Sequence, residues 1–245
     1  MELPPVTWVE SVASTQSVLV ARAHAGESAQ VLATTAQTAG RGRRGREWSC
    51  PPGAGLAMSV LVRLSRHDSW TWLPLVTGVA VHEALTQLSV PGGLGLKWPN
   101  DVVVDSGPRR GKLAGIIAER VDEPAGTDPA LVVGIGVNLA GRGLPPGATA
   151  LDSLGVAAEP DGLASSLLGS LEAWLDRWVV EPSRVRAAYR QRCVTVGQAV
   201  RVRLPGGEDI EGTAAAIDED GRLVLTTGRG AMSLTAGDVV HLRPR

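Results

Sequence analysis

The pattern of apolar residues changes near Cys193, and this change constrains the fold more than any other feature of the sequence. Before it, strand-like segments alternate with segments long enough for helices, as in Leu131–Leu139 followed by Asp161–Val179. Leu131–Leu139 is apolar throughout rather than alternating, which is typical of a strand covered on both faces. Residues 1–193 are therefore expected to form a first domain that contains both strands and helices.

After Cys193 the sequence contains only short β-rich runs separated by turns. The runs are Ala199–Leu204, Ile210–Ile217 and Leu223–Thr227. Such spacing predicts a barrel of roughly 50 residues, a size at which small barrels fold alone. Residues 194–245 are expected to form this second domain.

The remaining expected elements carry ordinary start and stop signals. Ser14 is a suitable N-cap for a helix, and Pro74 falls in the first turn of another. Asp105-Ser106-Gly107-Pro108 is a turn signal that predicts a hairpin between its flanking strands. The other expected strands are Val31–Thr35, Leu56–Leu64, Leu96–Val104 and Lys112–Val121, and the other expected helices are Trp70–Leu88 and Pro182–Arg192.

Charge, targeting signals and cysteine usage exclude several classes of protein. The formal net charge is −1, so the chain as a whole gives no reason to expect DNA or other nucleic-acid binding. No signal peptide opens the chain, and no apolar run reaches the length of a membrane span. Cys50 and Cys193 form neither a disulfide framework nor a zinc motif. We expect a cytoplasmic protein with reduced thiols and no membrane partner.

The segment Gly40–Arg46 places four arginines among three glycines. Guanidinium groups match phosphate and carboxylate oxygens, and glycines let backbone N–H groups approach the same oxygens. Trp48 follows and offers a flat face for a base. The segment is not a P-loop, because no Gly-Lys-Ser/Thr follows at the required spacing. It predicts an anion site, and a solvated basic patch or a nucleic-acid contact remains the alternative.

Two further segments carry polar residues at strand ends. In Lys97–Asp101, Pro99 limits strand pairing, so this stretch is expected to be a strand end or bulge. Asn100 and Asp101 could hold phosphate oxygens through Mg²⁺, or could simply make a turn. Lys112 stands at the head of an apolar strand, either solvated or aimed at an anion.

Single residues in other strands and loops suggest contacts with a ligand. Gly115 inside its strand suggests close approach of backbone or ligand. Asn138 ends an apolar strand with an amide that can read a purine edge. Gln37, just before the arginine segment, could be an ordinary loop residue. None of the four histidines has metal-ligand spacing.

Taken together, these segments resemble the bacterial biotin protein ligases, also called biotin–[acetyl-CoA-carboxylase] ligases. The resemblance covers nearly the whole chain and rests on the order and spacing of its motifs. The motifs are Ser14-Thr15-Gln16, Gln37 with Gly40–Arg46 and Trp48, Lys97–Asp101, Gly111–Gly115 and Gly136–Leu139. Gln16 stands where the family commonly has Asn.

The resemblance implies a class II synthetase-like α/β catalytic domain with a mixed sheet, followed by a small SH3-like barrel. It also implies two half-reactions: biotin and ATP give biotinyl-5′-AMP and pyrophosphate, and a carrier lysine then attacks the mixed anhydride. By the family's pattern, Lys112 and Arg43 are the catalytic residues that face the biotin carboxylate and the α-phosphate.

The remaining site residues follow from the same resemblance. The biotin site comprises Ser14, Thr15, Gln16, Gln37, Arg41, Gly42, Arg43, Lys112 and Gly115. The ATP site comprises Arg44, Arg46, Trp48, Asn100 and Asn138, with Mg²⁺ near Asn100 and Asp101.

Because water hydrolyses an acyl-adenylate, a lid over the intermediate is chemically useful. We expect Arg41–Arg46 to be mobile without ligand and ordered with biotinyl-AMP. Ser14 lies about a dozen residues from the start, which leaves no room for the DNA-binding domain of some family members. A ligase without repressor function is therefore expected, acting on the biotin carboxyl carrier domain of an acyl-CoA carboxylase as a monomer or weak homodimer.

Two other functions remain open from the sequence. A lipoate ligase or octanoyltransferase shares the superfamily fold, although the arginine-rich loop favours biotin. A nucleic-acid or carrier-binding module would use the loop and barrel without chemistry. A pyrophosphate-release assay with biotin or with lipoate distinguishes these two functions from a biotin ligase.

Overall fold

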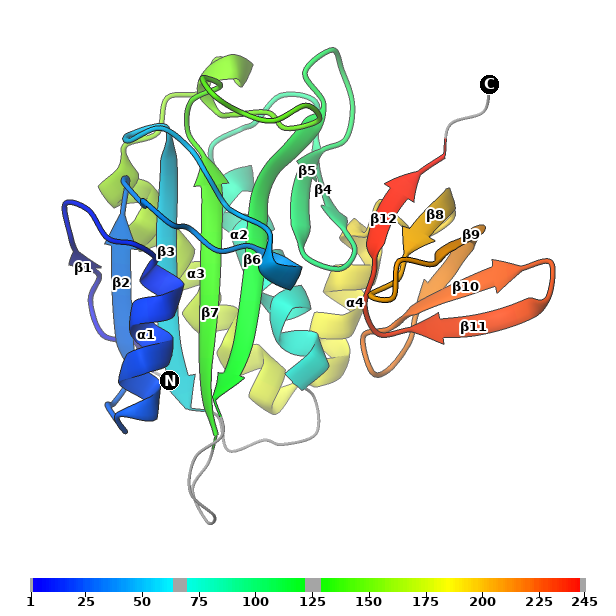
Figure 1. Ribbon diagram of the computed structural model, residues 1–245, viewed down its shortest axis with the longest axis horizontal. Helices are drawn as coiled ribbons and strands as arrows, with labels where there is room; N and C mark the ends of the chain where they lie inside the picture. Colours follow the sequence, from blue (N-terminus) through cyan, green and yellow to red (C-terminus); the bar gives the residue numbers. More distant parts are fainter. Residues whose placement is uncertain (1, 64–69, 122–128, 243–245) are drawn as a thin grey trace.

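A seven-stranded mixed sheet forms the centre of the molecule (Figure 1). The computed structural model describes residues 2–63, 70–121 and 129–242. The strand order is β1-β2-β3-β7-β6-β5-β4, with β1 parallel to β2 and all other pairs antiparallel. The strands are β1 (Thr7–Trp8), β2 (Gln30–Thr34), β3 (Gly55–Arg63), β4 (Leu94–Lys97), β5 (Asp101–Val104), β6 (Gly111–Val121) and β7 (Ala130–Asn138).

Helices cover both faces of this sheet. Figure 1 shows α1 (Thr15–His24) on one face, with α2 (Leu73–Thr86) and α3 (Pro160–Val180) on the other. Every residue of β7 is buried, which confirms the prediction of a strand covered on both sides. The mixed α/β class expected from the sequence is therefore confirmed. Within the described segments, no helix combines the length and hydropathy needed to cross a membrane.

Most helix boundaries agree with the sequence pattern. Ser14 caps α1, and its Oγ accepts a hydrogen bond from the Ser17 backbone N–H at 3.3 Å. The predicted helix Trp70–Leu88 is shorter, because its first three residues form a 3₁₀ turn before α2 begins at Leu73. α4 spans Pro182–Arg192 as expected.

The prediction of one strand over Leu96–Val104 was wrong. Trp98–Asn100 turn the chain, so that β4 and β5 form an antiparallel hairpin of their own. Proline cannot donate to a strand ladder, which is the physical reason for the break at Pro99. The predicted hairpin between β5 and β6 is confirmed, with a register shift between Val102 and Val103.

The C-terminal residues form a separate five-stranded antiparallel sheet of order β11-β10-β9-β8-β12. Its strands are β8 (Ala199–Arg203), β9 (Asp209–Ile217), β10 (Leu223–Thr227), β11 (Gly230–Leu234) and β12 (Asp238–His241). The three predicted runs are confirmed as β8, β9 and β10, and two strands were not predicted. The residue at which the first domain ends stays a prediction.

Two buried tryptophans dock this sheet against the rest of the molecule. The Trp72 indole donates to the Glu219 carbonyl oxygen at 2.7 Å, and the Trp98 indole donates to the Gly221 carbonyl oxygen at 3.0 Å. Both side chains are essentially inaccessible to solvent. The turn between β9 and β10 is therefore held by two hydrogen bonds inside an apolar interface.

Trp98→Ala should lower the free energy of unfolding by about 3–5 kcal/mol, because it removes a fully buried indole and leaves a cavity. Trp98→Phe keeps most of the packing and loses the hydrogen bond, so its loss should be clearly smaller. Urea unfolding measures both. A loss below about 1 kcal/mol for Trp98→Ala would contradict this role for the side chain.

Candidate active site

A cavity of about 450 Å³ lies between the N-terminus of α1, the arginine-rich loop, and strands β3, β6 and β7. Most of the residues predicted from the sequence line it, although they come from distant parts of the chain. These residues are Ser14, Thr15, Gln16, Gln37, Arg41, Gly42, Arg43, Arg46, Trp48, Asn100, Lys112, Gly115 and Asn138. Arg44 and Asp101 do not line it.

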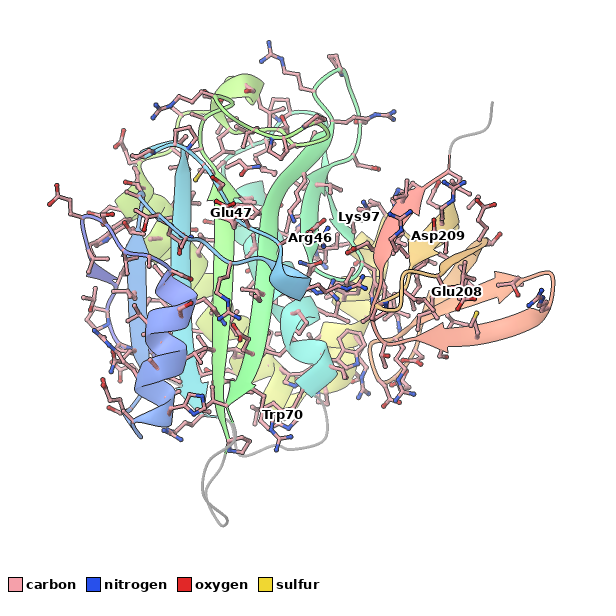
Figure 2. The ribbon with its side chains drawn as sticks, in the orientation of Figure 1. Arg46, Glu47, Trp70, Lys97, Glu208 and Asp209 are labelled. Carbon is pink, nitrogen blue, oxygen red and sulfur yellow. The ribbon has the colours of Figure 1, made fainter. Side chains whose placement is uncertain are left out.

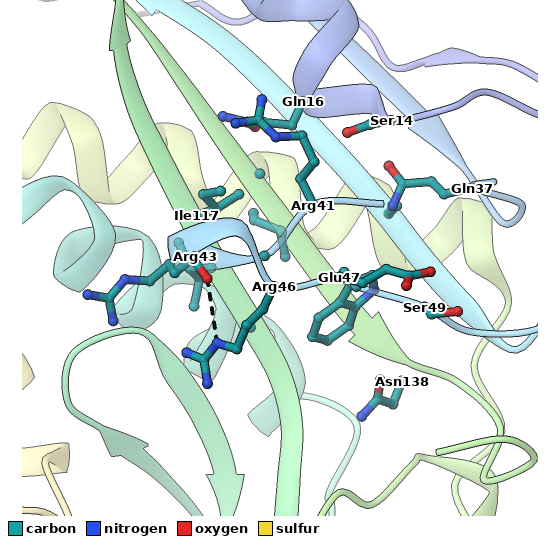
Figure 3. Close-up of a pocket in the computed structure, with 18 of the residues that line it drawn as sticks. Ser14, Gln16, Gln37, Arg41, Arg43, Arg46, Glu47, Ser49, Ile117 and Asn138 are labelled. Atoms are coloured by element: carbon teal, nitrogen blue, oxygen red, sulfur yellow. Dashed lines mark hydrogen bonds between the residues drawn. The ribbon is translucent and has the colours of Figure 1, made fainter. Parts of the chain in front are cut away.

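The two ends of the cavity differ in charge. Figure 3 places Ser14, Gln16 and Gln37 around one end, with Arg41 beside Gln16, and places Arg43 and Arg46 toward the other end. Because Arg41 is paired with Glu119, the first end carries no net charge, and next to a cationic end it suits a ligand that joins a neutral hydrogen-bonding group to an anion.

At the uncharged end, hydroxyl and amide groups bond to one another. Gln37 Oε1 accepts from the Thr15 backbone N–H at 2.9 Å and from Thr15 Oγ1 at 3.2 Å. Thr15 Oγ1 also lies 2.8 Å from Ser59 Oγ. Because Thr15 and Ser59 are buried, these bonds fix the orientation of the polar groups before any ligand arrives.

Gln16 is buried and bonded within the protein. Its Nε2 donates to the Val132 carbonyl oxygen at 3.0 Å and to Glu119 Oε1 at 3.2 Å. A Cβ at Gly134 would lie 2.7 Å from Gln16 Oε1, so the glycine makes room for this longer amide. The predicted contact of Gln16 with biotin stays a prediction, and the observed role is to anchor α1 on the sheet.

The arginine-rich loop is a small hairpin closed by its own backbone. The Trp48 N–H donates to the Gly40 carbonyl oxygen at 2.9 Å, and the Gly42 N–H donates to the Arg46 carbonyl oxygen at 2.7 Å. A Cβ at Gly40 would lie 2.3 Å from the Trp48 carbonyl oxygen, so this position requires glycine. The tip is a 3₁₀ turn over Arg43–Gly45.

The four arginines of the loop bind three different partners. Arg41 pairs with Glu119 at 3.3 Å, and Arg43 donates to Asn100 Oδ1 at 2.9 Å. Arg44 and Arg46 both pair with Asp238 of β12. The four positive charges of the loop are therefore distributed over three binding partners. Arg44 faces the C-terminal sheet rather than the cavity.

Lys112 lies across the glycines of the sheet. A Cβ at Gly115 would lie 2.9 Å from Lys112 Nζ and 3.0 Å from the Trp48 ring, and one at Gly136 would lie 2.4 Å from the same ring. Gly115 and Gly136 are register partners in β6 and β7. The sequence suggested close approach of backbone or ligand at Gly115, and the structure instead places the side chains of Lys112 and Trp48 there, so a ligand contact at Gly115 stays a prediction. The Lys112 Nζ forms an ion pair with Asp101 at 2.6 Å.

Burial changes the protonation equilibria of two cations near the site. It lowers the pKa of Arg43, with a smaller opposing effect from the charges of Asp238 and Asp101. It also lowers the pKa of Lys97, partly offset by Asp101. Loss of hydration strengthens the interaction of such cations with an incoming anion.

Asn138 is nearly fully buried, and its amide nitrogen donates to the carbonyl oxygens of Lys112 at 3.1 Å and Thr149 at 2.9 Å. Only the side-chain oxygen remains to bond a ligand, and it can only accept. The contact with a purine predicted from the sequence is therefore limited to an N–H donor of the base. The Trp48 Nε1 has no hydrogen-bond partner among the described residues.

The predicted Mg²⁺ ligands are already engaged by cations. Asn100 Oδ1 accepts from Arg43, and Asp101 Oδ1 is paired with Lys112. No group of three or more His, Cys, Asp or Glu residues suited to a metal occurs in the described parts of the chain. These two side chains alone would not hold a metal, and their contact with Mg²⁺ stays a prediction.

Sequence reasoning missed three residues around the cavity and loop. Ser59 is a lone hydroxyl in an apolar strand, a signal that could have been used. Glu119 ends an apolar segment and pairs with Arg41, and Asp238 lies in a strand that was not predicted. Their roles depend on contacts between residues far apart in the sequence.

Comparisons with known proteins agree with this geometry. The model of the biotin/lipoate A/B protein ligase family matches residues 8–138, and that of the biotin protein ligase C-terminal domain matches residues 195–242. A biotin–[acetyl-CoA-carboxylase] ligase of Mycobacterium tuberculosis is 43% identical, over 96% of this chain and 88% of its own length. One from Paracoccus denitrificans is 35% identical, over 86% and 90%.

A solved structure extends the similarity to the whole fold. Biotin protein ligase from Aquifex aeolicus, in complex with biotin and ATP, is 25% identical with a TM-score of 0.79. The match covers 99% of this chain and 100% of that one. With two family models matched along its length and relatives 43% and 35% identical over 96% and 86% of it, this chain belongs to the biotin/lipoate A/B protein ligase family.

Proposed function

We propose that this chain is an ATP-dependent biotin protein ligase. The observation that carries the proposal is the polarity of the cavity, which joins a hydrogen-bonding end without net charge, where Arg41 is paired with Glu119, to a cationic end. Biotin has a neutral ureido ring and a carboxylate, and relatives of this chain are named biotin–[acetyl-CoA-carboxylase] ligases.

In the first half-reaction, an oxygen of the biotin carboxylate attacks the α-phosphorus of ATP. The new O–P bond forms as the bond to pyrophosphate breaks, giving biotinyl-5′-AMP. Anion attacks polyanion, so positioned cations must offset the repulsion. We assign this role to Lys112 and Arg43, because both line the cavity and neither belongs to the uncharged end.

In the second half-reaction, the amine of an acceptor lysine attacks the acyl carbon and AMP leaves. We propose that the acceptor is the biotin carboxyl carrier domain of an acyl-CoA carboxylase, since the relatives are named for acetyl-CoA carboxylase. ATP is expected to enter as its Mg²⁺ complex, because Mg²⁺ binds chiefly phosphate oxygens and water.

We also expect a monomer or weak homodimer. β1 has only two residues, and the Val194 N–H bonds to the Leu96 carbonyl oxygen on β4, so neither edge of the seven-stranded sheet offers a long free strand. Sedimentation analysis at several concentrations tests this expectation. A tight dimer at all of them would contradict it.

Pyrophosphate release with different acids tests the proposed activity. The proposal predicts ATP turnover that depends on biotin. Release that depends on lipoate instead would move the substrate to the lipoate branch of the family. Release with neither acid would contradict the enzymatic function and favour a carrier-binding module.

A further inference from the structure

The arginine-rich loop meets the C-terminal sheet at one carboxylate, that of Asp238. Arg46 Nη2 lies 2.7 Å from Asp238 Oδ1, and Arg44 Nη1 lies 3.3 Å from Asp238 Oδ2. Arg44 Nη1 also donates to the Arg203 carbonyl oxygen at 3.3 Å. Each oxygen of one carboxylate therefore holds a different arginine of the loop.

Asp238 is available for this contact because the charged residue opposite it in the sheet already has another partner. Asp238 stands opposite Arg203 in the β12–β8 register, the natural partner for its charge. Arg203, however, is already engaged by Asp209 through two hydrogen bonds of 2.8 Å and 3.0 Å. A Cβ at Gly237 would lie 2.4 Å from Val202 Cγ1, so the backbone before Asp238 packs closely against β8.

The sheet that carries Asp238 is fixed relative to the cavity. The indoles of Trp72 and Trp98 hold its β9–β10 turn from inside the first domain. Figure 2 labels Arg46 and Lys97 where the two sheets meet, with Asp209 on the C-terminal sheet. Asp238 therefore contacts the loop from a sheet whose position is fixed by these hydrogen bonds.

The loop itself is built to reach Asp238. Arg44 has a left-handed backbone (φ 59°, ψ 36°), which is unfavourable for a residue with a Cβ and turns its side chain away from the cavity. Four arginines in seven residues repel one another, and Asp238 offsets the charge of two of them. It also acts on Arg43, whose pKa it raises against the larger effect of burial.

We infer that Asp238 is a positioning residue for the nucleotide end of the site. It holds Arg46 at the rim of the cavity and the loop in its closed hairpin before ATP binds, so that the C-terminal sheet contributes to ATP affinity without contacting the reacting atoms. The effect on ATP rests on the proposed function, whereas the contact between loop and sheet does not.

Asp238→Asn tests the inference, because it removes the charge and keeps the size of the side chain. The first readout is trypsin, which cleaves after arginine and therefore reports directly on the exposure of Arg41–Arg46. We expect cleavage there to accelerate by about 3- to 10-fold, the effect of losing two partly exposed ion pairs.

The second readout is the kinetics of biotinyl-AMP formation. The KM for ATP should rise by about 3- to 10-fold while kcat and the KM for biotin change by less than about 2-fold, since Asp238 acts through Arg44 and Arg46. Asp238→Glu should restore much of both properties.

Glu211→Gln is the matched control. It breaks an ion pair in the same sheet, with Arg201, whose partner on β12 is Val240 rather than Asp238, so cleavage and the KM for ATP should stay at the values of the unmodified protein. If Asp238→Asn fails to fold, Asp238→Glu carries the comparison, with loop cleavage expected between that of the unmodified protein and that of a peptide containing the loop.

Unchanged loop cleavage and an unchanged KM for ATP in Asp238→Asn would overturn the inference. A lower KM for ATP would also overturn it, because Asp238 would then compete with the nucleotide for the arginines. An unmodified protein that shows no biotin-dependent ATP turnover would contradict the proposed function, and the trypsin comparison would still decide whether Asp238 holds the loop.

Discussion

Lys112→Ala should lower the rate of biotinyl-AMP formation by about 10²- to 10³-fold or more, the usual loss when a positioned charge is removed from a site of developing negative charge. Lys112 is the cation that lies across Gly115 on the floor of the cavity, within 5.4 Å of the Trp48 ring centroid. Single-turnover formation of the adenylate from biotin and ATP measures the loss.

The same variant should keep its fold. The variant loses the ion pair of the side chain with Asp101, which is partly exposed. The hydrogen bonds that hold this residue in the fold are made by its backbone, which accepts from the Thr149 N–H and the Asn138 amide and donates to the Gly147 carbonyl oxygen. Its melting temperature should therefore stay within a few degrees of the original. Near-normal adenylation by a folded Lys112→Ala protein would show that its role is misassigned.

Arg43→Ala should reduce kcat/KM for biotin-dependent adenylation by about 10²-fold and shorten the lifetime of bound biotinyl-AMP. The Arg43 guanidinium lines the cavity, is partly buried and is oriented by Asn100 Oδ1 at 2.9 Å. A charge held in one orientation at an anion site acts on both the carboxylate and the phosphate. Release of labelled intermediate after gel filtration measures retention.

Arg44→Ala is the matched control for Arg43→Ala, since it removes the neighbouring guanidinium, which faces Asp238 rather than the cavity. Its effect on kcat/KM should be smaller, below about 10-fold, and should appear in the KM for ATP. Equal losses in the two variants would contradict separate tasks for the two arginines. Arg43→Lys, which keeps the charge and loses the planar fork, should fall between them.

A third expected result concerns the loop's response to ligand. Because the intermediate must be shielded from water, biotinyl-AMP should slow tryptic cleavage within Arg41–Arg46 compared with the ligand-free protein. An apo crystal with low displacement factors across a loop free of lattice contacts, unchanged by ligand, would count against this expectation.

The class of fold follows from the sequence because its evidence is local. Apolar periodicity, turn residues and caps identified β7, α3, α4 and three C-terminal strands without knowledge of their neighbours. The error over Leu96–Val104 arose because both apolar runs around Pro99 were assigned to one strand, although Lys97–Asp101 was expected to contain a strand end or bulge, which is where β4 ends. β11 and β12 were missed because Gly230–Leu234 and Asp238–His241 are short and partly exposed.

Residues of the candidate site could be predicted where the residue type is unusual for its place in a loop or strand. Arginines among glycines and a lysine heading an apolar strand stand out in any sequence. Glu119 and Asp238 do not, because a carboxylate on a strand has many ordinary uses, and Ser59 gives only the signal of a lone hydroxyl in an apolar strand. Their partners lie 78, 192 and 44 residues away along the chain, at Arg41, Arg46 and Thr15, so only the folded structure brings them together.

The proposed function requires that the cavity activate biotin for transfer to protein. Its most direct test is to incubate the protein with biotin, ATP, Mg²⁺ and a biotin carboxyl carrier domain, and to map the product by mass spectrometry. Biotin is expected on a single lysine of the carrier. This modification should disappear when ATP is omitted or when that lysine is replaced by arginine. A carrier that stays unmodified while lipoate is attached in its place, or while neither acid is attached, would contradict the proposed function.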